Sequence, residues 1–210
     1  MEIKKIALGS QGLVVPNIGL GCMGMTGFED GHMYGPADEQ EAIATIHRSL
    51  ELGGNFLDTA DLYGPFKNEQ LLAKAIAGKR DQYIIATKFG WEIDDENKVT
   101  WGINGKKEYF RRAIPRFQEA HFHKNIELVN AIEALAAEKQ VTSSQLALAW
   151  IMSKGIVPIP GTKRRKYLEQ NLAAAALELT AEDLLKLESI VPIGTDTGKP
   201  YDEFSMGLID

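Results

Sequence analysis

The 210-residue sequence predicts an α/β fold with a parallel β-sheet. Between about residues 18 and 88, strand-like stretches alternate with amphipathic helical stretches, and glycines such as Gly53 end the helices. Strand–helix repeats of this kind form parallel sheets with helices packed outside. The strands are expected at 18–22, 55–60 and 83–88, with a fourth short buried strand at 156–160.

The first twenty residues predict a β-hairpin. "KKIALGSQGLVVP" has two short strand-like runs around a Gly-Ser-Gln-Gly turn. A polar loop then continues to about Pro36. Asp38, with Glu41 three residues later, has the spacing of a capping box, and an amphipathic helix should run from there to Gly53.

The later helices are predicted by capping residues and by apolar residues that recur with helical periodicity. Asn68 is expected to cap "NEQLLAKAIAG", which ends at Gly78. Residues 91–120 show no clear period. Helices are expected again at 125–140, 143–155 and 181–190, and one more in "RRKYLEQNLAAAAL"; the tail after 192 has loop character.

Composition and charge narrow the classes of protein to consider. With 29 acidic and 23 basic residues the net charge is −6, which argues against nucleic acid or an anionic membrane as the main partner. Cys22 is the only cysteine, so no internal disulfide can form and a cytoplasmic location is expected. The sequence shows no apolar run near the ~20 residues of a membrane span, no signal peptide and no metal-ligand cluster.

Two charged residues stand where predicted parallel strands end. Asp58 closes "NFLD" and Lys88 closes "IIATK". Because side chains alternate along a strand, the two groups can face each other from neighbouring strands. In parallel sheets this is the edge at which sites are built. A buried structural ion pair explains the two residues equally well.

Tyr63 follows Asp58 by five residues and favours a catalytic interpretation. A phenol donates a proton poorly at neutral pH because its pKa is about 10, and an adjacent ammonium lowers that value. A carboxylate behind the lysine keeps the lysine charged. Tyr63, Lys88 and Asp58 therefore suit a general acid for reduction of a carbonyl to an alcohol. The alternative is an aromatic side chain that only fills the loop.

Several longer stretches resemble the aldo-keto reductases, closest to the bacterial NADP-dependent branch: "GLGCMGM", "FLDTADLYGPFKNEQLLAKAI", "IIATKFG" and "IVPIPGTKRRKYLEQNLAA". The resemblance covers most of residues 1–90 and about 115–195. It implies a (β/α)8 TIM barrel, NADPH as cofactor and hydride transfer to an aldehyde or ketone. It also implies that Tyr63 donates the proton and that Lys88 and Asp58 tune it.

The resemblance places a cofactor site at the helix that follows "PGT". Helix N-termini bind phosphate, and four consecutive basic residues, 163–166, suit the 2′-phosphate of NADPH. A solvated basic helix start is the alternative. Gln170 stands where the family often has Glu. The implied cofactor contacts are Gly21 and Met23 beside the nicotinamide, with Gly161, Thr162, Lys163, Gln170 and Asn171.

"GLGCMG", residues 19–24, also matches the dinucleotide-binding pattern G-x-G-x-x-G. A Rossmann fold requires a helix to open at these glycines. Here a loop continues past Gly35 instead, so we reject that interpretation. In the resembled barrel the same stretch ends the first strand.

The chain is too short for a whole barrel, which takes ~250 residues. In a single domain of residues 1–210, the family's central segment is missing between about 109 and 112, and about four βα units of ~30 residues each are absent. The remaining strands would form a truncated barrel in the order eight, one, two, three. Its open edges are expected to allow pairing of two copies as a homodimer.

Two functions stay open at this point. One is an NADPH-dependent reductase of aldehydes or ketones, impaired by the truncation. The other is a non-catalytic nucleotide-binding or subunit-like protein of the same fold. The missing segment carries the family's histidine, which none of His32, His47, His121 or His123 replaces convincingly. The substrate stays open because the loops that would select it are absent.

Overall fold

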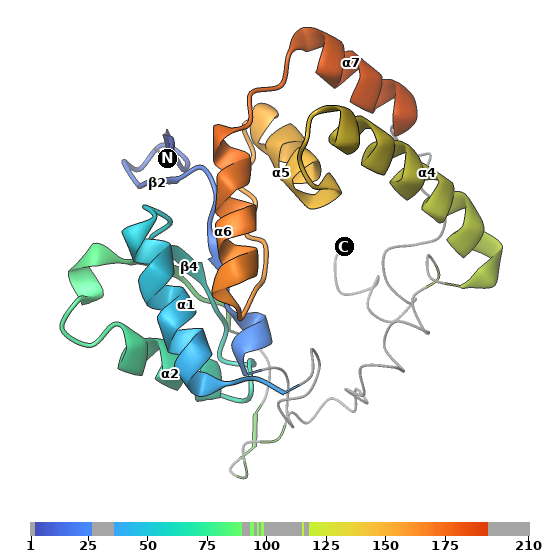
Figure 1. Ribbon diagram of the computed structural model, residues 1–210. Helices are drawn as coiled ribbons and strands as arrows, with labels where there is room; N and C mark the ends of the chain where they lie inside the picture. Colours follow the sequence, from blue (N-terminus) through green and yellow to red (C-terminus); the bar gives the residue numbers. More distant parts are fainter. Residues whose placement is uncertain are drawn as a thin grey trace.

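The computed structural model describes residues 3–26, 36–89, 93–94, 96, 98, 115 and 118–192. Figure 1 shows α1 (Glu39–Glu51) and α2 (Lys67–Ala75) packed beside the strands. A second group of helices consists of α4 (Glu119–Glu138), α5 (Ser143–Ser153) and α7 (Ala181–Ile190). Between the groups runs α6 (Arg165–Ala173), which contacts both α1 and α5. None of the described helices is long and apolar enough to span a bilayer.

The predicted hairpin and parallel sheet are both present. β1 (Lys5–Ala7) pairs antiparallel with β2 (Val14–Pro16). β3 (Leu20–Gly21), β4 (Phe56–Asp58) and β5 (Ile84–Ala86) form a parallel sheet in that order. The strands are shorter than predicted, but Gly21, Asp58 and Ala86 are aligned across the sheet. This register brings the three carboxyl ends to one edge.

Residues 156–160, the fourth predicted strand, lie along β3 without forming a regular strand. The Gly19 and Gly21 amides donate to the carbonyls of Pro158 and Pro160, at 2.9 and 3.2 Å, and Gly21 forms an isolated parallel bridge with Gly161. The prolines have no amide donor, which limits the ladder. The neighbour order is therefore 158–161, β3, β4, β5, as expected. Within the described residues the barrel is not closed, and β5 forms an edge.

The helix boundaries correct two predicted caps. Asp38 caps α1 by accepting from the Glu41 amide at 2.8 Å, but the Glu41 carboxylate binds Arg165, so only half of the capping box forms. Asn68 does not cap α2: the cap position is Phe66, in the left-handed region at φ 64°, and Asn68 is buried inside the helix. Helix α4 begins at Glu119, six residues before the predicted start.

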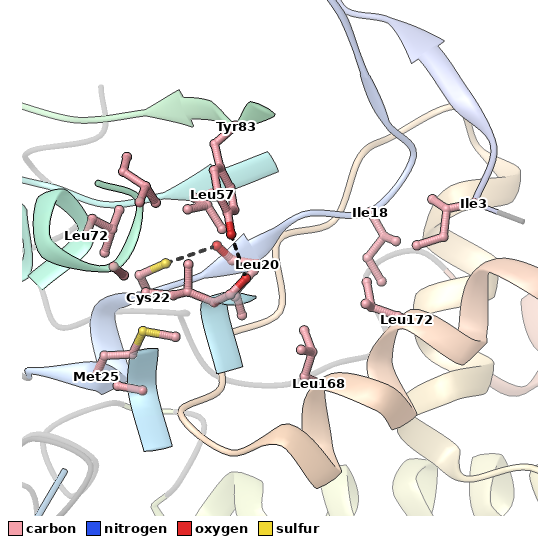
Figure 2. Close-up of a cluster of buried hydrophobic side chains, with 14 of the residues drawn as sticks. Ile3, Ile18, Leu20, Cys22, Met25, Leu57, Leu72, Tyr83, Leu168 and Leu172 are labelled. Carbon is pink, nitrogen blue, oxygen red and sulfur yellow. Dashed lines mark hydrogen bonds between the residues drawn. The ribbon is translucent and has the colours of Figure 1, made fainter. Parts of the chain in front are cut away.

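The main hydrophobic core joins the strands to α6 (Figure 2). Ile18, Leu20 and Leu57 from the strand region are fully buried, and Leu168 and Leu172 of α6 point toward them. A smaller separate cluster holds the second helix group together around Leu135, Leu146 and Leu187. The main cluster thus fixes the helix that follows "PGT" against the sheet that carries Asp58.

Candidate active site

Asp58, Lys88 and Tyr63 converge at the carboxyl end of the sheet. The Lys88 ammonium donates to Asp58 Oδ1 at 2.6 Å, to the Thr59 carbonyl at 2.9 Å and to Tyr63 Oη at 3.2 Å. It also lies 5.1 Å from the centre of the Tyr63 ring. The three donors of the ammonium therefore each have an acceptor, and one of these acceptors is the phenol oxygen. The structure brings together all three residues that the sequence predicted.

The contacts of Lys88 keep its side chain charged. Burial by itself would lower the pKa of Lys88, but the hydrogen bonds to Asp58 and Tyr63 outweigh this effect and the pKa is raised. Lys88 is thus an ammonium at neutral pH and a poor amine nucleophile. Its side chain is 52% exposed, whereas that of Asp58 is 12% exposed. The Lys88–Asp58 pair is therefore accessible to water on the side of Lys88.

Asn68 forms hydrogen bonds with several groups around Tyr63, a role that the sequence did not reveal. Its side-chain amide donates to the Cys22 carbonyl at 2.9 Å and to Thr26 Oγ1 at 2.7 Å, and its oxygen accepts from Thr59 Oγ1 at 2.6 Å. Its backbone amide donates to the Tyr63 carbonyl at 3.0 Å. One buried side chain thus links the ends of β3 and β4 to the start of α2. The only signal in the sequence was an Asn at a helix start, which more often indicates a cap.

Gly21 allows the C-terminal segment to lie against β3. A Cβ atom on Gly21 would come within 2.8 Å of the Ile159 carbonyl oxygen and 3.1 Å of the Gly161 Cα atom. Both contacts are with backbone, which has little room to move. A side chain at position 21 would therefore push the "PGT" segment away from the site.

A cavity of about 830 Å³ joins the Tyr63 cluster to the start of α6. Its size is in the range of small-molecule sites. Eight of the predicted site residues line it: Gly21, Met23, Asp58, Tyr63, Lys88, Gly161, Thr162 and Lys163. Pro36, Ile159, Arg164 and Tyr167 add to the lining, and of these only Arg164 belongs to the basic run noted in the sequence.

Gln170 and Asn171 do not line this cavity. Both are half-buried in the second half of α6, and the Gln170 carbonyl accepts from the Gln145 side chain of α5 at 3.0 Å. Their assignment as cofactor contacts stays a prediction. Near the mouth, the Thr162 hydroxyl accepts from the Arg164 amide at 3.2 Å, which orders the turn into α6.

The histidines that the structure describes lie elsewhere. His47 contacts the Ala75 carbonyl at 2.6 Å and so joins α1 to α2, while His121 and His123 lie in the first turns of α4. None of these three lines the cavity. His32 and the predicted junction at 109–112 fall outside the described residues. Within the described part of the chain, no cluster of His, Cys, Asp or Glu side chains is arranged to hold a metal ion.

The sequence was compared with models of known protein families. The model of the aldo/keto reductase family matches in two segments, residues 17–119 and 104–192, which together cover most of the chain. This chain belongs to the aldo/keto reductase family. Its Asp58, Tyr63 and Lys88 all lie in the first matched segment, and Gly161 to Lys163 lie in the second.

Several known aldo/keto reductases are similar to this chain in sequence or in structure. Probable aldo-keto reductase 1 of Glycine max is 27% identical over 334 aligned positions, covering 97% of this chain and 94% of that protein. The glycerol dehydrogenase of Gluconobacter oxydans superposes with a TM-score of 0.72 at 15% identity, over 95% of this chain and 98% of that chain. An aldo-keto reductase of Klebsiella pneumoniae in complex with NADPH has a TM-score of 0.63 at 19% identity, over 96% and 99%.

The comparisons also show that this reductase-family chain is shortened internally. An alignment of 334 positions on a chain of 210 residues leaves more than one hundred positions of the relative without a counterpart. The relatives have the (β/α)8 fold, of which the described residues retain a partial parallel sheet. The chain is thus shorter than these relatives, although the alignments extend over nearly all of their length.

Proposed function

We propose that this chain binds NADPH and reduces the carbonyl group of a small aldehyde or ketone to an alcohol. The observation that carries the proposal is the Lys88 ammonium, which contacts Asp58 and the Tyr63 hydroxyl at the same time. Membership of the aldo/keto reductase family supports the class of reaction. An NADPH-bound structural relative from Klebsiella pneumoniae supports the cofactor.

The residues of the site suit the proton half of this reaction. A bound NADPH would supply the hydride to the carbonyl carbon. Tyr63 would donate its hydroxyl proton to the carbonyl oxygen, and the Lys88 ammonium would stabilise the phenolate that is left. Asp58 holds Lys88 in position and balances its charge. Solvent can return the proton to Tyr63 after the alcohol leaves, because the cluster lies at an open mouth.

The lining of the cavity also fits the cofactor. Gly21 and Met23 line the same cavity as Tyr63, where a nicotinamide would have to approach the carbonyl. Gly161, Thr162 and Lys163 also line the cavity and come just before the N-terminus of α6 with its positive dipole. We propose these five residues as cofactor contacts, with Gln170 and Asn171 further along α6.

A Tyr63→Phe variant tests the catalytic role. The change removes one hydroxyl and leaves the ring, so we expect kcat for a panel of simple aldehydes to fall at least about 100-fold. NADPH affinity, measured by fluorescence titration, should stay within about twofold. Tyr83→Phe is the matched control, because it removes a buried hydroxyl that contacts the Ile46 carbonyl at 3.3 Å, away from the cavity. Equal turnover by Tyr63→Phe and the parent chain would refute the proton-donor role.

A nucleotide-binding protein without turnover is the second candidate. The 52% exposure of the Lys88 side chain favours it, because water at an open mouth weakens the electrostatic stabilisation on which proton transfer depends. NADPH binding by the parent chain with no oxidation of NADPH by any aldehyde would support this candidate over the reductase.

We further propose that two copies associate through the open edges of the sheet. β5 ends the described sheet on one side, and residues 156–160 border it on the other. Large apolar side chains are exposed at both places, with Phe89 89% and Ile156 59% exposed. Pairing β5 of one copy with 156–160 of its partner, twice about a two-fold axis, would join four strands from each copy into a ring of eight.

A further inference from the structure

Glu41 places its carboxylate on the first turn of α6. Its Oε1 atom accepts from the backbone amide of Arg165, the first residue of that helix, at 3.0 Å. The Arg165 guanidinium also donates to Glu41, at 3.2 Å from Nε and at 2.9 Å from the terminal nitrogen that contacts Oε2. The Glu41 carboxylate therefore accepts hydrogen bonds from both a helix amide and a guanidinium.

This contact replaces a local one. Glu41 stands at the third position of α1, from which its side chain could have completed the capping box with Asp38. Its carboxylate instead reaches a residue 124 positions away in the sequence. Hydrogen bonds from the side chain and backbone of Arg165 lower the pKa of Glu41, so the carboxylate carries its full charge at neutral pH.

The same elements form the phosphate end of the proposed cofactor site. The Lys163 ammonium donates to the Pro36 carbonyl at 2.8 Å, just before α1. Lys163, Pro36 and Arg164 all line the cavity. In sequence, Arg164 stands between Lys163, which contacts Pro36, and Arg165, which contacts Glu41 of α1. An unfilled helix amide and a guanidinium are the groups that a phosphate monoester would seek. In this chain the Glu41 carboxylate already binds both groups.

We propose that Glu41 is an internal competitor for the 2′-phosphate of the dinucleotide, and that it lowers the preference of this chain for NADPH over NADH. The inference rests on the proposed function, which places the dinucleotide beside α6. A phosphate that binds at the first turn of α6 must displace the Glu41 carboxylate from Arg165 or lie next to it. Either arrangement weakens binding of NADPH, which carries the 2′-phosphate, and leaves binding of NADH, which lacks it, unaffected.

The opposite role predicts the opposite result. If Glu41 served to hold Arg165 in place for the phosphate, then loss of its charge would weaken NADPH binding. The sign of the change in affinity therefore separates competition from positioning. Neither role requires hydride transfer, so binding measurements are sufficient.

The test is a Glu41→Gln variant titrated calorimetrically with four ligands. NADPH and 2′,5′-ADP carry the 2′-phosphate, whereas NADH and ADP lack it. We expect Glu41→Gln to bind the first two about three to fivefold more tightly than the parent chain does, since an exposed charge at a helix end changes affinity by this order. Binding of NADH and ADP should change less than twofold. Unchanged or weaker binding of NADPH and 2′,5′-ADP would overturn the proposal.

Glu39→Gln is the matched control, because Glu39 lies in the same first turn of α1 but pairs with Lys74 and does not contact α6. It should leave all four affinities unchanged. Glu41→Asp keeps the charge on a shorter side chain and serves as a second variant in case Glu41→Gln loses stability. Its affinities for NADPH and 2′,5′-ADP should lie between those of the parent chain and those expected for Glu41→Gln. Should the four ligands bind neither the parent chain nor Glu41→Gln, both the inference and the nucleotide site fall. Binding of all four with unaltered ratios would refute only the competition.

Discussion

Lys88 shows how one side chain can organise a site at the residue scale. An ammonium offers three donors, and Lys88 directs them to a carboxylate, a backbone carbonyl and a phenol, all within residues 58–63. Burial opposes the charge on Lys88, but the hydrogen bonds to Asp58 and Tyr63 raise its pKa and keep the ammonium charged. The proposed chemistry therefore depends on contacts that lie within a few ångströms of one nitrogen atom.

The Asn68 side chain links Thr59, Cys22 and Thr26 through hydrogen bonds inside the fold. Asn68→Ala would leave the Thr59 hydroxyl and the Cys22 carbonyl without their buried partner, so we expect the free energy of unfolding to fall by about 2–4 kcal/mol. Urea denaturation followed by circular dichroism measures the loss. Asn55→Ala is the control, because its amide donates to the Gln82 carbonyl in an exposed setting and should cost less than about 1 kcal/mol. Equal losses in the two variants would argue against a structural role for Asn68.

Helix caps decide the boundaries at the element scale. Thr142 with Gln145 and Thr180 with Asp183 form complete capping boxes at the starts of α5 and α7. In the second box Asp183 also accepts from Lys139 at 2.7 Å, which ties the start of α7 to the end of α4. The hydrogen bond from Lys139 is the main reason that the pKa of Asp183 is lowered to about 2.

Asp183→Asn tests this junction through its dependence on pH. Because the pKa of Asp183 is lower in the folded chain than in the unfolded chain, its stabilisation is complete above about pH 4 and is lost as the pH falls toward 2. At pH 7 we expect the variant to be less stable by about 2 kcal/mol, and near pH 2 the difference should vanish. Urea denaturation at several pH values measures both.

Glu182→Gln provides the control in the same helix turn, since Glu182 pairs with the exposed Lys186 one turn on, at 3.2 Å. Its effect at pH 7 should stay below about 0.5 kcal/mol. A loss for Asp183→Asn that persists unchanged at pH 2 would show that packing, and not charge, is responsible.

Over the whole molecule, the described residues form a partial barrel in which the C-terminal part of the chain returns to lie beside β3. Residues 158–161 reach β3 from the C-terminal part of the chain, and α6 then packs against the same core. This return of the chain brings the basic residues near 163 to the cavity that holds Tyr63. It leaves β5 as an edge among the described residues.

The proposed dimer can be tested by its mass and by changing a residue at one sheet edge. The parent chain should have twice its 23.2 kDa mass in light scattering after size-exclusion chromatography. Ile156→Lys places a charge at the edge and should weaken association at least about tenfold. Leu185→Lys is the control, because Leu185 is 68% exposed on α7, away from both edges, and the variant should stay dimeric. A parent chain that is monomeric at all concentrations would rule the dimer out.

The sequence by itself determined the hairpin, the parallel strands, most helices and the trio Asp58, Lys88 and Tyr63. These follow from local properties: side-chain alternation, helical period, caps, and the rule that parallel strands end at one edge. The tertiary structure decided the rest. It placed Asn68 inside the fold, turned the Glu41 carboxylate toward Arg165 and kept 156–160 from forming a regular strand. Such outcomes depend on which distant groups compete for the same donors and acceptors, and no short window of sequence contains both partners.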